Sequence, residues 1–227
     1  MKGERHASVR GRQLDHLNNT LKLQPGDPLS VGLLNGQIGT GKIMSVSTDS
    51  VELEITWEAQ PPPPLPLTLI LGLPRPKMLK RIIQTCATMG VKRLYLINAW
   101  KVEKSYWQTP ILEAASLREH CILGLEQAKD TLLPEIYQRR LFKPFVEDEL
   151  ASLSAESRKL LAHPGSASQC PISLNAATTL VIGPEGGFTP YEVGMFQRLG
   201  FEGVHLGPRI LRVETAVPTL LGRLFCQ

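Results

Sequence analysis

The chain has 227 residues and a net charge of +4, with 42% hydrophobic and 20% charged residues. This composition is typical of a folded protein with one or two domains and excludes an intrinsically disordered chain. No apolar run reaches the roughly 18–20 residues that cross a bilayer, and the basic N-terminus lacks the apolar stretch of a secretory signal, so we expect no membrane contact and a cytoplasmic location.

The first 60 residues contain short segments that predict a small β-rich domain. Gly36–Lys42 has the glycine and lysine spacing of a phosphate-binding loop, but Ile43 stands where that loop needs Ser or Thr, so we interpret it as a glycine-rich hairpin. Asn35-Gly36 is a strong hairpin-turn signal. Periodicity predicts a short helix over 16–21 and strands over 29–31, 38–46 and 51–57. A small barrel is the expected outcome.

A proline-rich segment divides the chain. Five of the six residues over 61–66 are proline, which can continue neither a helix nor a central strand. We therefore expect one domain over 1–64 and a second over 65–227.

The second domain alternates predicted strands and helices. Strands are expected over 67–71, 91–97, 135–141, 179–182 and 204–206. Helices are expected over 76–89, 113–129, 147–162, 190–199 and 214–225. This order predicts an α/β domain with a largely parallel sheet.

The four cysteines suggest neither a disulfide framework nor a metal site. Cys86, Cys121, Cys170 and Cys226 form no C-x-x-C pair, and no histidine flanks them at metal-ligand spacing. We expect four reduced thiols and no bound metal.

Two glycine-containing turns follow predicted buried strands near the C-terminus. Gly183–Gly187 leads into a capping box at Thr189 and Glu192, and Gly207-Pro208 leads into a charged segment and the last helix. Glycines at a strand end let the backbone approach a ligand closely, although a tight turn alone also needs them. His163-Pro164 is a candidate third wall of one pocket, although a histidine before proline is more often a turn residue.

Basic residues gather in two segments. Between Arg75 and Lys104 there are eight basic residues and one acid, and the first 22 residues carry five basic residues. Such clusters suit phosphate neutralisation, although a solvated mixed-charge surface is the alternative. The aromatic residues among them suit either base stacking or ordinary packing: Tyr95, Trp100, Tyr106 and Trp107.

The segments IGPEGGF and LGPRILRVETA, at 182–188 and 206–216, resemble the C-terminal signature of the ribosomal RNA small subunit methyltransferase E family, in the SPOUT class. The resemblance extends to residues 15–21, Pro25-Gly26-Asp27, Lys77-Met78, Met89-Gly90-Val91 and Glu126-Gln127 with 134–136. The chain departs from the family pattern at its N-terminus, over 98–105 and at Ala128-Lys129-Asp130.

The resemblance implies a PUA-like β-barrel domain over 1–64 and a methyltransferase domain over 65–227 whose deep trefoil knot binds S-adenosylmethionine. It also implies a homodimer that methylates N3 of a uridine in 16S rRNA, within the small ribosomal subunit or its RNA. The cofactor-binding residues it implies are His163, Pro164, Ile182, Gly183, Glu185, Gly186, Gly187, Leu206, Gly207, Leu211 and Arg212.

The chemistry of uracil N3 suggests candidate catalytic residues within that signature. Arg212 and Arg209 are candidates for stabilising the anion or binding phosphate, and Glu214 for the base or for orienting Arg212. A structural ion pair or a helix-terminal charge is the alternative for each. Expected RNA contacts are Arg10, Arg12, Arg75, Lys77, Lys80, Lys101 and Lys104. Methylation of another rRNA or tRNA nucleotide, or a non-catalytic role in ribosome assembly, are the alternative functions.

Overall fold

A computed structural model describes residues 5–20 and 23–225, which separate into two compact units. The first unit comprises the residues up to Pro62 together with Lys129–Leu132, and the second comprises Pro63–Ala128 and the chain from Leu133 onward. None of the helices within the described ranges has the length and apolarity to cross a bilayer. Cys226 and the predicted helical position Leu21 lie outside the described residues.

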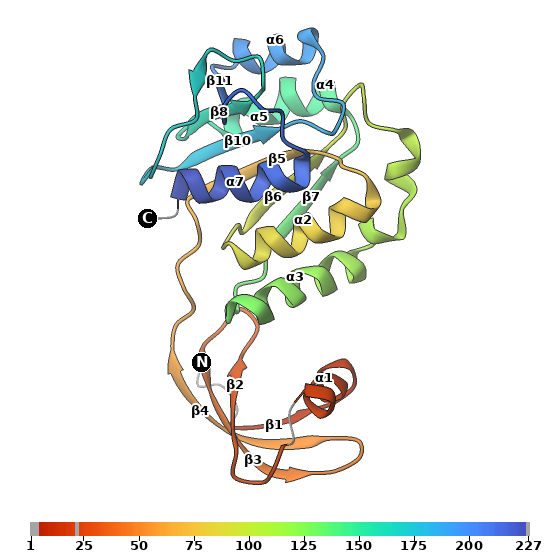
Figure 1. The fold of residues 1–227 in the computed structure, drawn as a ribbon, viewed down its shortest axis with the longest axis vertical. Coiled ribbons are helices and arrows are strands. Elements are labelled where there is room, and N and C mark those ends of the chain that lie inside the picture. The colour runs from red at the N-terminus through yellow and green to blue at the C-terminus, as the bar shows by residue number, and fades with distance from the viewer. Residues whose placement is uncertain (1–4, 21–22, 226–227) are drawn as a thin grey trace. The chain divides into compact units, whose positions relative to one another are not determined.

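The first unit is a four-stranded antiparallel sheet with one helix (Figure 1). The predicted hairpin is confirmed, because Asn35 adopts a φ of 59° and the Gly36 N–H donates to the Leu33 carbonyl at 2.7 Å. Gly36–Lys42, which has the spacing of a phosphate-binding loop, lies in the hairpin turn and the strand that follows it, as interpreted. The strand order is β1-β4-β3-β2, and the elements are β1 (His6–Val9), α1 (Arg12–Thr20), β2 (Pro28–Gly32), β3 (Ile38–Val46) and β4 (Val51–Ala59).

The second unit is an α/β unit with a parallel sheet, as predicted, and the sheet has seven strands, of which Arg158–Ala162 and Ser168–Gln169 were not predicted. All its strand pairs are parallel, in the order β7-β6-β5-β10-β8-β11-β9. Its strands are β5 (Leu67–Gly72), β6 (Arg93–Ile97), β7 (Glu135–Arg139), β8 (Arg158–Ala162), β9 (Ser168–Gln169), β10 (Thr178–Ile182) and β11 (Glu202–His205).

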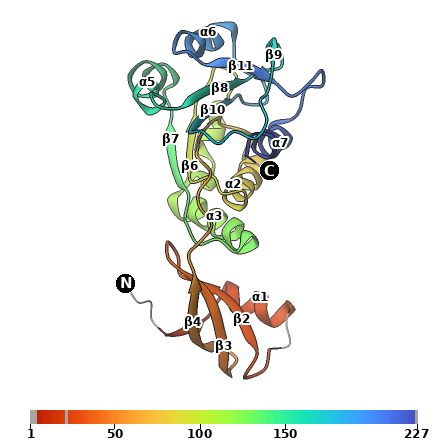
Figure 2. The ribbon, with the colours of Figure 1, turned by 90° about the vertical axis from the view of Figure 1, so that its left-hand side faces the viewer.

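Helices cover both faces of this sheet. Figure 2 shows α2 and α7 on one side of the sheet and α5 on the other, and α2 packs against both α3 and α7. The helices are α2 (Pro76–Thr88), α3 (Ala114–Ala128), α4 (Phe142–Pro144), α5 (Leu150–Leu153), α6 (Pro190–Arg198) and α7 (Val213–Phe225), with a π-helical turn at Phe145–Glu149 and 3-10 turns at Lys104–Gln108 and Pro110–Leu112.

The predicted helix over 147–162 is wrong. Only short helical turns occupy its first part, and Arg158–Ala162 forms β8, between β10 and β11 in the sheet. Leu160 and Leu161 have no exposed surface there, because neighbouring strands and helices enclose them. Burial in the sheet overrides the helical propensity of the leucines and alanine. His163 follows directly after the carboxyl end of this strand.

Candidate functional site

The sheet order brings the three predicted turns together at the carboxyl ends of neighbouring strands. β10, β8 and β11 are neighbours, and Ile182, Ala162 and Val204 share one level of the register. Because these strands are parallel, the residues that follow, Gly183, His163 and His205, leave the sheet side by side. The carboxyl ends of parallel strands are where open α/β sheets hold their ligands.

The turn after β10 is shaped by close backbone contacts. The Gly187 N–H donates to the Pro184 carbonyl at 2.8 Å, and Gly187 adopts a φ of 67°, which favours glycine. Gly72, the last residue of β5, lies against Pro184 so closely that a Cβ there would stand 2.6 Å from the Pro184 nitrogen. The turn therefore has a fixed backbone with little room behind it.

Two side-chain hydrogen bonds tie this turn to its neighbours. The Glu185 carboxylate accepts from the Arg75 N–H at 2.9 Å, at the start of α2, and the Lys101 ammonium donates to the Gly186 carbonyl at 2.8 Å. Lys101 is exposed, as its predicted RNA contact requires, but it also supports the turn. Glu185 therefore fixes its own loop through a hydrogen bond to the backbone at the start of α2.

Glu192 is a positioning residue whose full role the sequence did not reveal. Its capping box with Thr189 is present as predicted, with the Thr189 N–H donating to Glu192 Oε2 at 2.7 Å. Its other oxygen, Oε1, accepts from the Trp100 N–H at 2.7 Å. Only 3% of Glu192 is exposed. This buried carboxylate therefore joins the start of α6 to the loop after β6, a long-range contact with no local sequence signal.

His163 and His205, which follow or end neighbouring strands, each accept a backbone hydrogen bond in a turn of the same kind. His163 Nδ1 accepts from the Gly165 N–H at 3.1 Å, and His205 Nδ1 accepts from the Gly207 N–H at 3.0 Å. In each case the ring nitrogen accepts from the backbone N–H two residues further along the chain. His163 thus lies at the predicted site as an organiser of its turn, and His205 has the same role on the neighbouring strand.

The third turn carries the candidate catalytic residues. The Arg212 carbonyl accepts from the Thr215 and Ala216 N–H groups at 2.9 and 2.7 Å, which fixes its backbone at the start of α7. The side chains of Arg209 and Arg212 are exposed, and Glu214 is half-buried. Within the described residues no ion pair joins Glu214 to Arg212, so the guanidinium is available to a ligand.

The remaining cofactor candidates line the same turns. Ile182 is buried at the end of β10, whereas Pro164 is exposed beside His163. Leu206 and Leu211 are half-buried on either side of the exposed Pro208–Ile210 segment. Half-buried leucines beside open glycine backbone combine apolar and polar contact surface in one place.

The predicted RNA contacts are all exposed and belong to both units. Arg10 and Arg12 lie in the first unit. In the second unit, three cations lie at the start of α2, where the first turn has no acid: Arg75, Lys77 and Lys80. Positive charges oppose the helix dipole there, so these cations do not stabilise the helix. Lys104 begins the 3-10 turn after β6.

The four aromatic candidates differ strongly in solvent exposure. Tyr95 and Trp107 are buried and Tyr106 is half-buried, so packing explains these three. Trp100 is 84% exposed, although Glu192 holds its backbone. A fixed backbone that presents an indole ring to solvent suits stacking on a nucleobase.

The cysteines are not suited to nucleophilic chemistry. Cys86, Cys121 and Cys170 are free and buried. Burial raises the pKa of the Cys86 thiol to about 12 and that of Cys121 to about 11, which disfavours the reactive thiolate. Over the parts of the chain that the structure describes, no group of three or more His, Cys, Asp or Glu side chains could hold a metal ion.

Comparison with known proteins gives concordant matches. A family model described as RNA methyltransferase domain matches residues 61–224. The chain is 29% identical over 219 residues to the ribosomal RNA small subunit methyltransferase E of Treponema pallidum, over 92% of this chain and 80% of that protein. It is 30% identical over 224 residues to the protein of the same name from Synechocystis, over 93% of this chain and 70% of that protein.

A solved structure shares the fold. It is the crystal structure of a ribosomal RNA small subunit methyltransferase E from Neisseria gonorrhoeae bound to S-adenosyl methionine, with a TM-score of 0.75 and 20% sequence identity. The similarity covers 96% of this chain and 90% of that one. The likeness therefore includes both units.

Proposed function

This chain belongs to the ribosomal RNA small subunit methyltransferase E family, and from that membership we propose that it transfers a methyl group from S-adenosylmethionine to N3 of a uridine in 16S rRNA. The observation that carries the proposal is the alignment of three turns at the ends of β10, β8 and β11. These turns contain the residues that the family signature assigns to the cofactor.

The residues of the three turns fit such a cofactor. A Cβ built on Gly187 or Gly207 would have no described atom within 4 Å apart from those of the glycine and its two chain neighbours, so the backbone there is open to a ligand. His163, Gly183–Gly187 and Leu206–Arg212 would hold the cofactor, through backbone polar groups and the leucine side chains. When bound, S-adenosylmethionine supplies an electrophilic methyl group, so the protein mainly positions the two reactants and manages one proton.

The proton at uracil N3 is the remaining chemical problem. Arg212 stabilises negative charge on the uracil oxygens, with Arg209 as a second cation or phosphate ligand. Glu214, half-buried in the first turn of α7, accepts the proton or orients a cation. All three residues lie on the turn after β11 or at the start of the helix that follows it.

The target uridine has to be unpaired, because N3 lies on the Watson–Crick edge. The cations at the start of α2 hold the RNA backbone, and Trp100 stacks on a base beside the glycine-rich turn. The Lys101–Gly186 and Trp100–Glu192 hydrogen bonds support this arrangement, since both join the loop after β6 to the segment that follows β10.

The proposal includes the family architecture. We assign a PUA-like RNA-binding domain to 1–64 and a trefoil-knotted methyltransferase domain to 65–227, active as a cytoplasmic homodimer. The position of β11 supports the knot, because it lies between β8 and β9, both of which precede β10 in the chain. The hydrogen bonds from the Ser173 and Leu174 N–H groups to the Arg223 and Leu224 carbonyls add support, since they hold the segment before β10 against the end of α7.

The decisive experiment measures modified nucleosides in rRNA. Mass spectrometry of 16S rRNA from a strain lacking this protein is expected to show loss of 3-methyluridine, with recovery when the wild-type chain is supplied. Persistence of 3-methyluridine in the deletion strain would contradict the proposed target. Loss of a different methylated nucleotide would reassign the base while keeping the enzyme class.

A further inference from the structure

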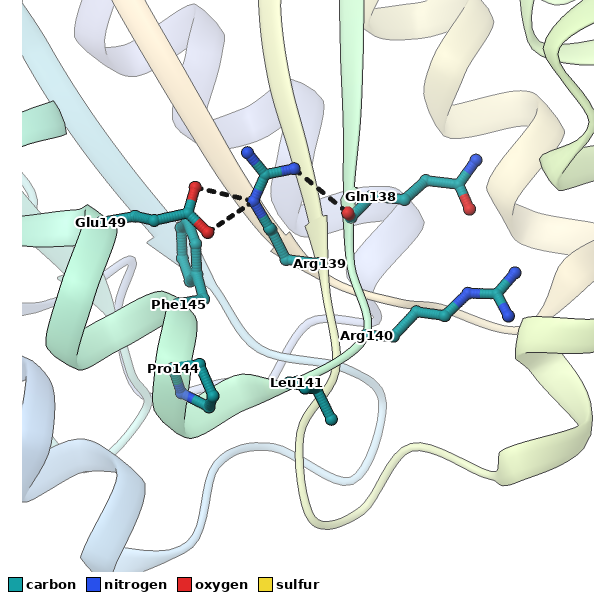
Figure 3. Close-up of a pocket in the computed structure, with 7 residues that line it drawn as sticks. All are labelled: Gln138, Arg139, Arg140, Leu141, Pro144, Phe145 and Glu149. Carbon is teal, nitrogen blue, oxygen red and sulfur yellow. Dashed lines mark hydrogen bonds and ion pairs between the residues drawn. The ribbon is translucent and has the colours of Figure 1, made fainter.

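The pocket at the carboxyl end of β7 contains a charged pair that is already neutralised. Its volume is about 360 Å³ (Figure 3). Arg139 Nε lies 2.8 Å from both Glu149 carboxylate oxygens, and Nη1 donates to the Gln138 carbonyl at 3.2 Å. Figure 3 shows the Arg140 side chain pointing away from this pair. The pair in this pocket therefore needs no charged ligand to balance it.

The turn after β11 has a feature that the proposed chemistry does not use, an isoleucine exposed to solvent. Ile210 is 81% exposed, close to the 84% of Trp100. A single exposed isoleucine on an ordinary surface needs no explanation. Ile210 differs because it lies in the chain between Arg209 and Arg212, which are both exposed as well. These are the two cations proposed to meet the uridine or its phosphate.

The backbone presents Ile210 from a turn whose two ends are fixed. At one end, Gly207 adopts a φ of 127°, which favours glycine, and its N–H donates to His205 Nδ1 at 3.0 Å. Pro208 restricts the backbone further. At the other end, the Arg212 carbonyl accepts two N–H groups from the first turn of α7. The turn therefore holds an apolar side chain in solvent at a defined position.

The other residues of this segment have roles that Ile210 cannot share. Leu206 and Leu211 are half-buried and suit the cofactor, and Glu214 is half-buried in the first turn of α7. The side chain of Ile210 has no polar atom, so it can neither bind a phosphate nor accept a proton. An apolar side chain between two cations suits a ligand that combines negative charge with apolar faces. An RNA strand is such a ligand, because its phosphates are charged and its base faces are not.

Exposure of the target uridine requires that its base leave the stack. A base that swings out leaves a gap between its two neighbours, which tend to close it by stacking on each other. Proteins that unstack a base step frequently insert an apolar side chain, isoleucine included, between the bases. Arginines beside such a side chain can hold the phosphates next to the gap.

We propose that Ile210 is a wedge that enters the gap left by the target uridine and keeps the neighbouring bases apart. The inference rests on the proposed function and adds to it the residue that makes N3 accessible. Ile210 contacts the bases that flank the target and not the reacting atoms. It therefore acts on the exposure of the uridine and takes no part in methyl transfer itself.

The first test replaces Ile210 by Ala and compares two RNA oligonucleotides. One carries the target uridine, located by mass spectrometry of rRNA fragments, between its natural neighbours, and the other has an abasic site on each side of that uridine. Ile210→Ala is expected to lower kcat/KM about tenfold or more on the first RNA, because the wedge no longer offsets the cost of unstacking. On the abasic RNA, which has no flanking stack to break, the variant is expected to stay within about twofold of wild type. Ile210→Leu should restore most of the activity, since it keeps the apolar volume.

Ile172→Ala is the matched control for this test. Ile172 is 64% exposed and lies in the second unit, between β9 and β10 and outside the three turns. Its replacement is expected to leave activity on both RNAs unchanged. The affinity for S-adenosylmethionine, measured calorimetrically, is expected to be equal in wild type, Ile172→Ala and Ile210→Ala.

The second test measures unstacking without methyl transfer. The base next to the target uridine is replaced by 2-aminopurine, whose fluorescence increases when it loses a stacking partner. Saturating wild-type protein is expected to increase the fluorescence, and saturating Ile210→Ala to leave it close to that of free RNA. A full increase with Ile210→Ala would contradict the wedge.

The two tests separate this inference from the proposed function. If wild type methylates RNA and Ile210→Ala matches it on both oligonucleotides, the wedge is overturned and the proposed function stands. Equal loss on both RNAs, with weaker cofactor binding or dissociation of a dimer, would assign Ile210 to the cofactor site or to a subunit interface and overturn the wedge. If wild type increases the fluorescence but transfers no methyl group, the proposed function fails and the wedge stands. If it does neither, both are contradicted.

Discussion

Two carboxylates fix the loops at the carboxyl ends of the strands, and each does so through a backbone hydrogen bond rather than through contact with a substrate. Glu185 bonds to the backbone of Arg75, and Glu192 bonds to the backbone of Trp100. Each fixes a residue whose own side chain is exposed and suited to RNA. These bonds define the backbone positions of both residues while the Trp100 indole stays exposed. The Arg75 side chain itself hydrogen-bonds to Tyr106.

Among single residues, Arg212 gives the clearest prediction. Arg212→Ala is expected to lower the rate of RNA methylation at least 100-fold, because the negative charge on the uracil oxygens loses its stabilising cation. Affinity for S-adenosylmethionine, measured calorimetrically, is expected to stay within a few-fold of wild type. Arg198→Ala, which removes an exposed arginine from the end of α6, serves as the control and should leave both unchanged.

Loss of folding or of cofactor binding in Arg212→Ala would instead assign Arg212 a structural role. The backbone hydrogen bonds that fix Arg212 do not involve its side chain, so the substitution preserves the start of α7.

The residue types of the site were readable in the sequence, but their contacts were not. The glycines, the capping box and the exposed cations follow from local pattern. The exposure of Trp100 against the burial of Trp107 does not, because both stand in the same polar loop and only tertiary packing distinguishes them. The contact between the Arg140 guanidinium and the Trp107 ring has no local signal either, because the two residues lie in different segments.

Among the elements, the end of β5 packs closely against the turn after β10. Gly72→Ala is expected to shift this turn, since the added methyl group would stand 2.6 Å from the Pro184 nitrogen and 3.1 Å from the Gly183 carbonyl carbon. Overpacking of this kind costs about 1–3 kcal/mol. Calorimetric titration is expected to show S-adenosylmethionine affinity reduced at least tenfold, with a modest fall in Tm.

Gly194→Ala is the matched control, because its Cβ would meet only the end of the Arg198 side chain at 3.6 Å, within α6. It should leave cofactor affinity intact and slightly raise Tm, since alanine favours a helix. Equal cofactor affinity in Gly72→Ala and wild type would show that the turn after β10 does not form the cofactor site.

The strands and helices were mostly predictable, with one instructive failure. Uninterrupted apolar runs identified β5 and β10, and proline and glycine marked the limits of α2. The sequence over 158–162 favours a helix locally, because leucine, alanine and lysine all have high helix propensity. Its central place in the sheet is a property of the assembled domain, and so is the two-residue β9, which is too short to show periodicity.

The first unit includes a short segment that lies far along the sequence from its other residues. Lys129–Leu132 belongs to that unit, although α3 precedes it and β7 follows it. Thr131 Oγ1 donates to the Gly36 carbonyl at 2.5 Å, and the Thr131 carbonyl accepts from the Asn35 N–H at 2.8 Å. The departure from the family pattern at Ala128-Lys129-Asp130 lies directly beside this contact.

Thr131→Val is expected to destabilise the first unit by about 1–2 kcal/mol, because the half-buried Gly36 carbonyl loses its hydroxyl donor while the side-chain shape is kept. Hydrogen–deuterium exchange should become faster over residues 33–37 and stay unchanged in β10. Thr56→Val, an exposed threonine on β4, is the control and should have little effect. Unchanged exchange over 33–37 would mean that the hydroxyl contributes nothing to the hairpin.

The insertion of β11 between β8 and β9 has a kinetic consequence. Glu202 pairs with Leu160 and His205 with Gln169, so this part of the sheet closes only after distant segments have met. Chains with many non-local pairings fold slowly, because loop-closure entropy opposes each one. Until β11 arrives, the edge of the apolar strand β8 that it covers remains open to other chains. Refolding yield should therefore decrease as protein concentration rises.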